Sequence, residues 1–168
     1  MNNTNNAVEE IIFAAVKPED AENKFIRCVT KSAFENVGLE IVEEGFFEMT
    51  RSDVQVHYPH HFKGSYENAK PFYKELEDYA VSGRWYGMVI KGKNASAIAR
   101  KLVDPKEHVD EMAKEATLRI YIPKVLGRKP DMTKNIIHAS DSAKNGAAEV
   151  ARYRAMRARY IKEHGREL

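Results

Sequence analysis

Cysteine is almost absent from this sequence, since Cys28 is the single example among 168 residues. One thiol cannot build an intrachain disulfide framework, so we expect a protein of a reducing compartment. Cys28 lies in an apolar helical stretch, and we expect it in the core. Long hydrophobic runs are missing as well, which excludes a membrane-spanning helix. These features predict a cytoplasmic protein that does not enter a membrane.

An excess of charge of either sign is also lacking. There are 27 Lys and Arg against 25 Asp and Glu, a net charge of +2 that does not by itself imply a nucleic-acid partner. The length fits a single domain over residues 1–168. The first residues, "MNNTNN", are polar and lack the basic-then-apolar order of a signal peptide. We therefore expect residues 1–9 to form a flexible tail.

Apolar patterning along the chain predicts strands that alternate with helices. Strands are expected at 11–16, 39–49, 84–92 and 135–138, and helices at 20–36, 94–103 and 142–163, with two short helices within 52–81. We expect Gly45 to mark a bulge or a close approach. Helices interleaved with four strands indicate an α+β domain in which helices pack on an antiparallel sheet.

Local signals sharpen some of these boundaries. Asn94 is expected to cap the helix at 94–103, and Asp104, Pro105 and Glu107 form a typical helix start. Residues 118–134 contain Pro123, Gly127 and Pro130, so we expect a long loop there.

The stretch "NIIHASDS" at 135–142 places His138 between an apolar pair and several small or polar residues. Ser140, Asp141 and Ser142 are all good N-cap residues, and helix starts attract anions such as phosphate. An imidazole beside such a start could accept a phosphoryl group. A histidine that merely ends a strand is the alternative interpretation.

Several cationic residues could meet an anionic ligand. Lys17 precedes Pro18 directly after the first predicted strand, where ligands commonly bind. Arg100 and Arg119 each stand in an otherwise apolar or neutral segment, and two guanidiniums can neutralise and orient a polyphosphate. Ordinary surface cations remain the alternative for all three residues.

The segment "HYPHHFKGSYENAKPFY" at 57–73 is rich in histidine and aromatic residues. His57, His60 and His61 could share a helix face, but no carboxylate or cysteine completes a metal site and Pro59 disturbs the helix. Phe72 could protrude and stack on a nucleobase, or it could belong to the core.

The order and spacing of these motifs resemble the nucleoside diphosphate kinase family. The resemblance rests on Lys17-Pro18, "HY" at 57–58, "PFY" at 71–73, the helix that ends in Arg100, "TLR" at 117–119, "NIIHASDS" and Glu149. It runs from about residue 11 to about residue 150, which is most of the chain. It implies a ferredoxin-like α/β sandwich with a four-stranded antiparallel sheet covered by helices.

The resemblance also implies a ping-pong kinase in which His138 takes the γ-phosphate of ATP and passes it to a nucleoside diphosphate. It implies that Lys17, Tyr58 and Arg119 surround the transferred group, that Arg100 holds the β-phosphate, and that Asn135 and Lys17 contact the ribose. Phe72 would stack on the base with Leu76 behind it, and Ser140 and Glu149 would support the histidine, with Glu149 on the ring nitrogen that is not phosphorylated. Mg²⁺ would be bound mainly through the nucleotide phosphates, with no dedicated protein ligands. A homo-oligomer is expected, with a hexamer favoured over a tetramer or dimer.

The chain departs from the family pattern at several places. Glu19-Asp20 stands where the family has Asp-Gly, and Ala139 stands where it has glycine. The segment 103–134 is longer than usual and lacks the threonine that commonly touches the β-phosphate, and the last helix runs past the usual end. These departures leave a catalytically silent nucleotide-binding or scaffold protein of the same fold as the alternative. A ferredoxin-like RNA-binding module is a further alternative, which the near-neutral charge weakens.

Overall fold

A four-stranded antiparallel sheet forms the centre of the computed structural model, which describes residues 8–59, 71–131 and 134–165. Its strands are β1 (Glu9–Val16), β2 (Glu40–Phe47), β3 (Trp85–Lys93) and β4 (Ile137–Ala139). Their order across the sheet is β2-β3-β1-β4, and each neighbouring pair is antiparallel. The expected α+β fold with a four-stranded antiparallel sheet is therefore confirmed. Most of the expected N-terminal tail, residues 1–7, lies outside the described residues.

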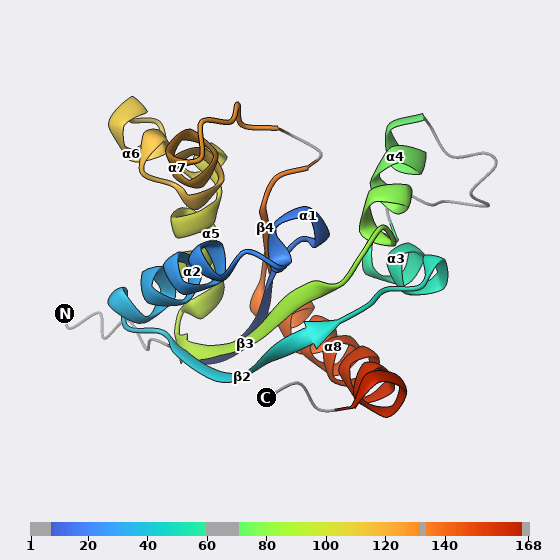
Figure 1. Ribbon diagram of the computed structural model, residues 1–168. Helices are drawn as coiled ribbons and strands as arrows, with labels where there is room; N and C mark the ends of the chain where they lie inside the picture. The colour runs from blue at the N-terminus through green and yellow to red at the C-terminus, as the bar shows by residue number, and fades with distance from the viewer. Residues whose placement is uncertain (1–7, 60–70, 132–133, 166–168) are drawn as a thin grey trace.

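Helices cover both faces of this sheet (Figure 1). They are α1 (Pro18–Ala21), α2 (Lys24–Asn36), α3 (Arg51–His57), α4 (Pro71–Ala80), α5 (Ala95–Val103), the 3₁₀ turn η2 (Pro105–Glu107), α6 (Glu111–Glu115), α7 (Leu118–Val125) and α8 (Ala143–His164). Helices α2 and α5 lie on one face and α8 lies on the other. None of the described helices combines the length and hydropathy needed to cross a bilayer.

Strand β1 supplies a core to each face, because successive side chains of a strand point in opposite directions. Ile12, Ala14 and Val16 pack among residues of α2, α5 and α7. Phe13 and Ala15 pack instead among residues of β2, α3 and α8. The burial of this strand on both faces explains why its sequence is a continuous apolar run rather than an alternating one.

Two glycines let α8 lie close to the sheet. A Cβ at Gly146 would come within 3.0 Å of the Ile11 carbonyl oxygen, and a Cβ at Gly87 would come within 2.3 Å of the Tyr153 ring. The Tyr153 ring is fully buried against Phe13 and Phe47, with centroid distances of 5.2 Å to each. Small residues at these two contacts therefore fix how near α8 approaches β1 and β3.

The expected loop at 118–134 is wrong in its first half, because α7 occupies Leu118–Val125 with Pro123 inside the helix. Proline lacks the N–H that would bond one turn back, which normally disfavours such a position. Leu118 and Ile122 are buried one turn apart in the core under α7. Their burial outweighs the proline signal that the sequence displays.

Three smaller expectations also need correction. The helix expected at 20–36 is interrupted, because the Asn23 side chain accepts hydrogen bonds from the amides of Phe25 and Ile26 and starts α2 anew. Cys28 is exposed on α2, so the prediction of a core thiol is wrong. Asn94 does precede α5, but in a left-handed conformation (φ 53°) and without a side-chain cap.

Gly45 was expected to mark a bulge or a close approach. The irregularity in β2 falls between Ile41 and Glu43 rather than at Gly45. A Cβ at Gly45 would overlap the Arg157 guanidinium, and its φ of 150° disfavours other residues. The close approach is therefore confirmed, and the bulge lies elsewhere in the strand.

Candidate active site

His138 lies on the short edge strand β4, where it pairs with Ala15 of β1. The strand is anchored at its end by the Ser140 amide, which donates to the Phe13 carbonyl (2.9 Å). The His138 ring lies over Phe13 with a centroid distance of 5.7 Å. Helix α8 then begins at Ala143, and the hydroxyl of Ser142 caps it by accepting from the Asn145 amide. The imidazole is thus held at a rigid junction between strand and helix.

Glu149 of α8 reaches back to this histidine. His138 Nε2 lies 3.0 Å from Glu149 Oε2, and the Ser140 hydroxyl lies 2.6 Å from the same oxygen. Ser140 is fully buried and also accepts a hydrogen bond from the Phe13 amide (3.0 Å). Glu149 is only 7% exposed, so its carboxylate faces the protein interior rather than solvent.

The Glu149 carboxylate stays ionised in this environment. Burial alone would raise its pKa, but the facing His138, with smaller contributions from His57 and the Ser140 hydroxyl, lowers the pKa to about 2. A carboxylate accepts hydrogen bonds only. The ring nitrogen that faces it therefore carries the proton, and Nδ1 of neutral His138 is left with a free lone pair.

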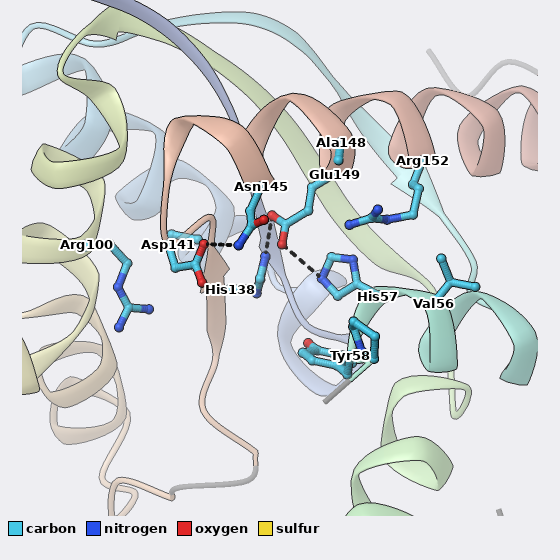
Figure 2. Close-up of a pocket in the computed structure, with 12 residues that line it drawn as sticks. Val56, His57, Tyr58, Arg100, His138, Asp141, Asn145, Ala148, Glu149 and Arg152 are labelled. Atoms are coloured by element: carbon cyan, nitrogen blue, oxygen red, sulfur yellow. Dashed lines mark hydrogen bonds and ion pairs between the residues drawn. The ribbon is translucent and has the colours of Figure 1, made fainter. Parts of the chain in front are cut away.

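His57, the last residue of α3, lies on the other side of Glu149. Its Nε2 is 4.0 Å from Glu149 Oε1, and its ring centroid is 4.8 Å from that of His138 (Figure 2). Among the described residues, neither ring nitrogen has a hydrogen-bond partner. Burial, followed by the electrostatic influence of nearby His138, lowers the pKa of His57 to about 3. His57 is therefore a neutral imidazole at any pH near 7.

A cavity of about 350 Å³ opens beside these groups. Its walls come from α3, α5, β4 and α8, and the site residues among them are His57, Tyr58, Arg100, His138 and Glu149. The Tyr58 ring stands edge-on to His138 with a centroid distance of 6.3 Å. Burial raises the pKa of Tyr58 well above its usual range, so its hydroxyl remains a donor. Figure 2 shows Arg100 and Arg152 at opposite ends of this group.

Arg100 of α5 and Arg119 of α7 converge on one carboxylate. Asp104 Oδ2 accepts from an Nη of Arg100 (2.8 Å) and from an Nη of Arg119 (2.6 Å). Arg119 also donates from Nε to the Ile137 carbonyl (3.0 Å), which ties α7 to β4. The sequence predicted both arginines as phosphate ligands but indicated Asp104 only as part of a helix start. Nothing in the neighbouring sequence reveals that its carboxylate accepts hydrogen bonds from two guanidiniums.

Lys17 lies directly after β1 and is only 4% exposed. Burial, together with the charge of Arg119, lowers the pKa of Lys17 to about 7, while Asp131 opposes this shift. Its amide donates to the Ile136 carbonyl (2.9 Å), which places it beside the start of β4. Asn135 and Arg119 line a second cavity of about 160 Å³, together with Arg128, Lys129 and Lys134.

Glu19 and Asp20, which stand where the family has Asp-Gly, contact a residue of the segment 103–134, which also departs from the family pattern. Arg128, which follows α7, lies 2.6 Å from Asp20 Oδ1 and 3.7 Å from Glu19 Oε1. Asp20 is buried, so its charge requires such a partner. The two departures from the family pattern therefore contact each other.

Phe72 and Leu76 lie on α4, away from both cavities. Phe72 is 47% exposed, as a stacking residue would need to be, while Leu76 is 6% exposed. The Phe72 ring contacts that of Tyr73 at a centroid distance of 5.6 Å. Neither residue lines the two cavities around His138 and Asn135. The structure thus does not bring these two predicted residues together with the histidine.

Two of the three histidines considered for a metal site, His60 and His61, lie outside the described residues. His57 instead joins His138 and Glu149, whose possible ligand atoms lie within 4.8 Å of one another. Imidazole nitrogens suit transition metals, whereas Mg²⁺ prefers oxygen ligands. Within the described part of the chain, this donor set is therefore not a magnesium cage.

Comparisons with known proteins agree with this fold. A family model described as nucleoside diphosphate kinase matches residues 10–155. The nucleoside diphosphate kinase of Bacillus licheniformis is 33% identical over 144 residues, covering 84% of this chain and 85% of that protein. The one from Methanocaldococcus jannaschii is 33% identical over 143 residues, covering 85% and 91%. A crystal structure of the Aquifex aeolicus nucleoside diphosphate kinase superposes with a TM-score of 0.67 and 25% identity, over 87% of this chain and 95% of that one.

The sheet with its covering helices defines a ferredoxin-like α+β fold, and the relatives define an enzyme of the phosphotransferase class. More specifically, the chain belongs to the nucleoside diphosphate kinase family. The resemblance seen in the motifs is thereby confirmed.

The buried neutral His57 predicts a specific acid sensitivity. An unfolded histidine has a pKa of about 6.5, while folded His57 has a pKa of about 3. Between these values the unfolded chain binds a proton that the folded chain does not, so stability falls as the pH falls from 6.5. We expect His57→Gln to reduce the slope of the unfolding free energy against pH by as much as about 1.4 kcal/mol per pH unit between pH 6 and 5.

Urea denaturation at a fixed protein concentration measures this slope. The window lies above the range in which Glu149 titrates, because the pKa of that carboxyl falls from an ordinary 4.5 to about 2. His164→Gln, at the exposed end of α8, removes a histidine that is not buried and serves as the control. An unchanged slope in His57→Gln would contradict a neutral buried His57.

Proposed function

We propose that this chain transfers the γ-phosphate of ATP to nucleoside diphosphates by a ping-pong mechanism through a phosphohistidine on His138. The observation that carries the proposal is the bond from His138 Nε2 to the buried carboxylate of Glu149 (3.0 Å). That bond holds a proton on Nε2 and directs the lone pair of Nδ1 outward. The nucleotides, the mechanism and a single functional domain over residues 1–168 belong to the same proposal, as does a cytoplasmic location, where such nucleotides are available.

In the first half-reaction, Nδ1 of His138 attacks the γ-phosphorus and forms an N–P bond. The bond from the γ-phosphorus to the bridging oxygen breaks, and its electron pair leaves with the nucleoside diphosphate. The imidazole gains positive charge while keeping its Nε2 proton, and the Glu149 carboxylate stabilises that charge. The second half-reaction reverses these steps with another nucleoside diphosphate as acceptor.

Four further predicted residues are proposed to act on the phosphates. Arg100 shares the cavity with His138 and is proposed to hold the β-phosphate. Lys17, Tyr58 and Arg119 are proposed to surround the transferred group, where positioning and charge stabilisation supply most of the catalysis. Lys17 with a pKa of about 7 would take up a proton when an anionic phosphate binds beside it.

The nucleoside end of the ligand is proposed to extend away from the histidine. Asn135 and Lys17 would contact the ribose, and exposed Phe72 would stack on the base with Leu76 behind it. Phe72 lies outside the two cavities, so this part of the proposal requires the nucleotide to bridge from the cavity to α4.

Mg²⁺ is proposed to bind mainly through the nucleotide phosphates, whose charge it reduces. The described residues fit this arrangement in one respect. Asp104, the buried carboxylate at the two arginines, already accepts from both guanidiniums and from the Lys106 amide. Its carboxylate is therefore paired with cationic side chains and is not available as a ligand for Mg²⁺.

Incubation with γ-labelled ATP and no acceptor tests the function. We expect label on His138 that is lost in acid and stable in base, as a phosphoramidate is, and that is released by a nucleoside diphosphate. His138→Ala should carry no label, whereas His164→Ala should be labelled normally. Label that survives acid, or that persists in His138→Ala, would overturn the phosphohistidine on His138, whereas no label at all would favour the catalytically silent nucleotide-binding protein.

Glu149→Gln tests whether the carboxylate orients and stabilises the histidine. The substitution keeps the shape of the side chain but removes its charge, so kcat should fall by roughly tenfold or more, about 1.4 kcal/mol of barrier, with little change in KM. Initial rates with ATP and a nucleoside diphosphate give both constants. Glu163→Gln, at the exposed far end of α8, is the matched control. Full turnover by a well-folded Glu149→Gln would leave His138 without its proposed orienting partner.

A homo-oligomer is also proposed, with a hexamer favoured and a tetramer or dimer as the other possibilities. The proposal follows the family resemblance, and the changed segment 103–134 is where subunit contacts of the family usually lie. Light scattering at micromolar concentration should give at least the mass of a dimer. The mass of one chain, 19.2 kDa, would contradict the proposal.

A further inference from the structure

Asp104 occupies an unusual electrostatic position for a buried carboxylate. It follows the last residue of α5, and its amide donates to the Arg100 carbonyl (2.8 Å). The C-terminal end of a helix carries partial negative charge, so a carboxylate there is opposed by the helix itself. Asp104 is nevertheless only 4% exposed. Its burial therefore depends on the cations that it contacts.

Those cations are the two guanidiniums to which the proposed function assigns phosphate binding. Both reach the same oxygen, Asp104 Oδ2, while Oδ1 accepts from the Lys106 amide (3.0 Å) and caps η2. Burial pushes the pKa of Asp104 upward, but the Lys106 amide and the charges of Arg119 and Arg100 outweigh it, so the pKa is lowered. Asp104 therefore stays ionised beside both arginines.

The carboxylate has two effects on a ligand that carries negative charge. It fixes two long side chains from different helices at one point, which reduces the mobility that they must lose when phosphate binds. It also cancels one of the two positive charges and repels an approaching phosphate. In a partly buried site the second effect is strong, because charges there are poorly screened.

We infer that Asp104 is a positioning residue that holds Arg100 and Arg119 in place while weakening the attraction of this site for nucleotide phosphates. The inference rests on the proposed function in assigning the two arginines to phosphate. It adds that the affinity for nucleoside phosphates is limited by a carboxylate of the chain itself. Removing that charge therefore tightens binding, a direction opposite to the one that simple damage to the site would produce.

Calorimetric titration with ADP tests the inference directly. Asp104→Asn keeps the shape of the side chain, and Asp104→Ser keeps a hydroxyl that can cap η2, so at least one variant is expected to fold. Both lose the charge, and we expect each to lower the Kd for ADP by at least fivefold and to steepen its dependence on salt. Unchanged or weaker binding in a folded variant would overturn the inference.

Glu107→Gln is the matched control. Its carboxylate contacts the same Arg100 at 3.3 Å but is 40% exposed, whereas the ion pair of Arg119 is with Asp104. The change in net charge equals that of Asp104→Asn, and we expect the Kd to change by less than about twofold. An equal tightening in both variants would assign the effect to overall charge and overturn the role of Asp104.

The titration separates the inference from the proposed function, because binding is measured without turnover. If the chain forms no phosphohistidine but its Asp104 variants bind ADP more tightly, the proposed function is overturned and the inference is supported. Normal labelling of His138 with an unshifted Kd in both variants would support the function and overturn the inference.

Discussion

The buried carboxylate of Glu149 is the contact on which the rest of the site depends. A carboxylate loses much hydration on burial, and hydrogen bonds from Ser140 and His138 compensate for that loss. These bonds join α8 to β4, so they exist only if the helix lies close to the sheet. Gly146 permits this approach, since a Cβ there would come within 3.0 Å of the Ile11 carbonyl oxygen. The orientation of His138 therefore depends on the close packing of α8 against the sheet.

Positive charge is the second constraint, because the site gathers cations that repel one another. Lys17 responds through its lowered pKa, which reflects burial and the nearby charge of Arg119. Arg119 cannot easily lose its proton, so it needs an anionic neighbour, and Asp104 supplies one. A phosphotransferase site must attract phosphate without becoming unstable by itself. In this chain, the inferred role of the shared carboxylate is to stabilise the two guanidiniums at a cost in attraction for the phosphate.

The strands and most helices could be predicted because their apolar patterns are local. The position of His138 on a strand shortly before α8 was likewise visible, since apolar residues, histidine and cap residues follow one another in the chain. Predictions failed where a distant contact overrode a local signal. Pro123 indicated a loop, but burial of Leu118 and Ile122 stabilises α7. Asp104 indicated a helix start, and its second function depends on Arg119, fifteen positions away.

The site thus has two parts that respond differently to changes in sequence. The histidine part is built by β1, β4 and α8 and depends on contacts around Glu149. The proposed phosphate part is built by α5, η2 and α7, and η2 and α7 lie in the segment 103–134 that departs from the family pattern. A direct hydrogen bond joins them, from Arg119 Nε to the Ile137 carbonyl, and it uses backbone rather than a side chain of β4. Substitutions in the phosphate part can therefore change the affinity for the ligand while Nε2 of His138 keeps its proton.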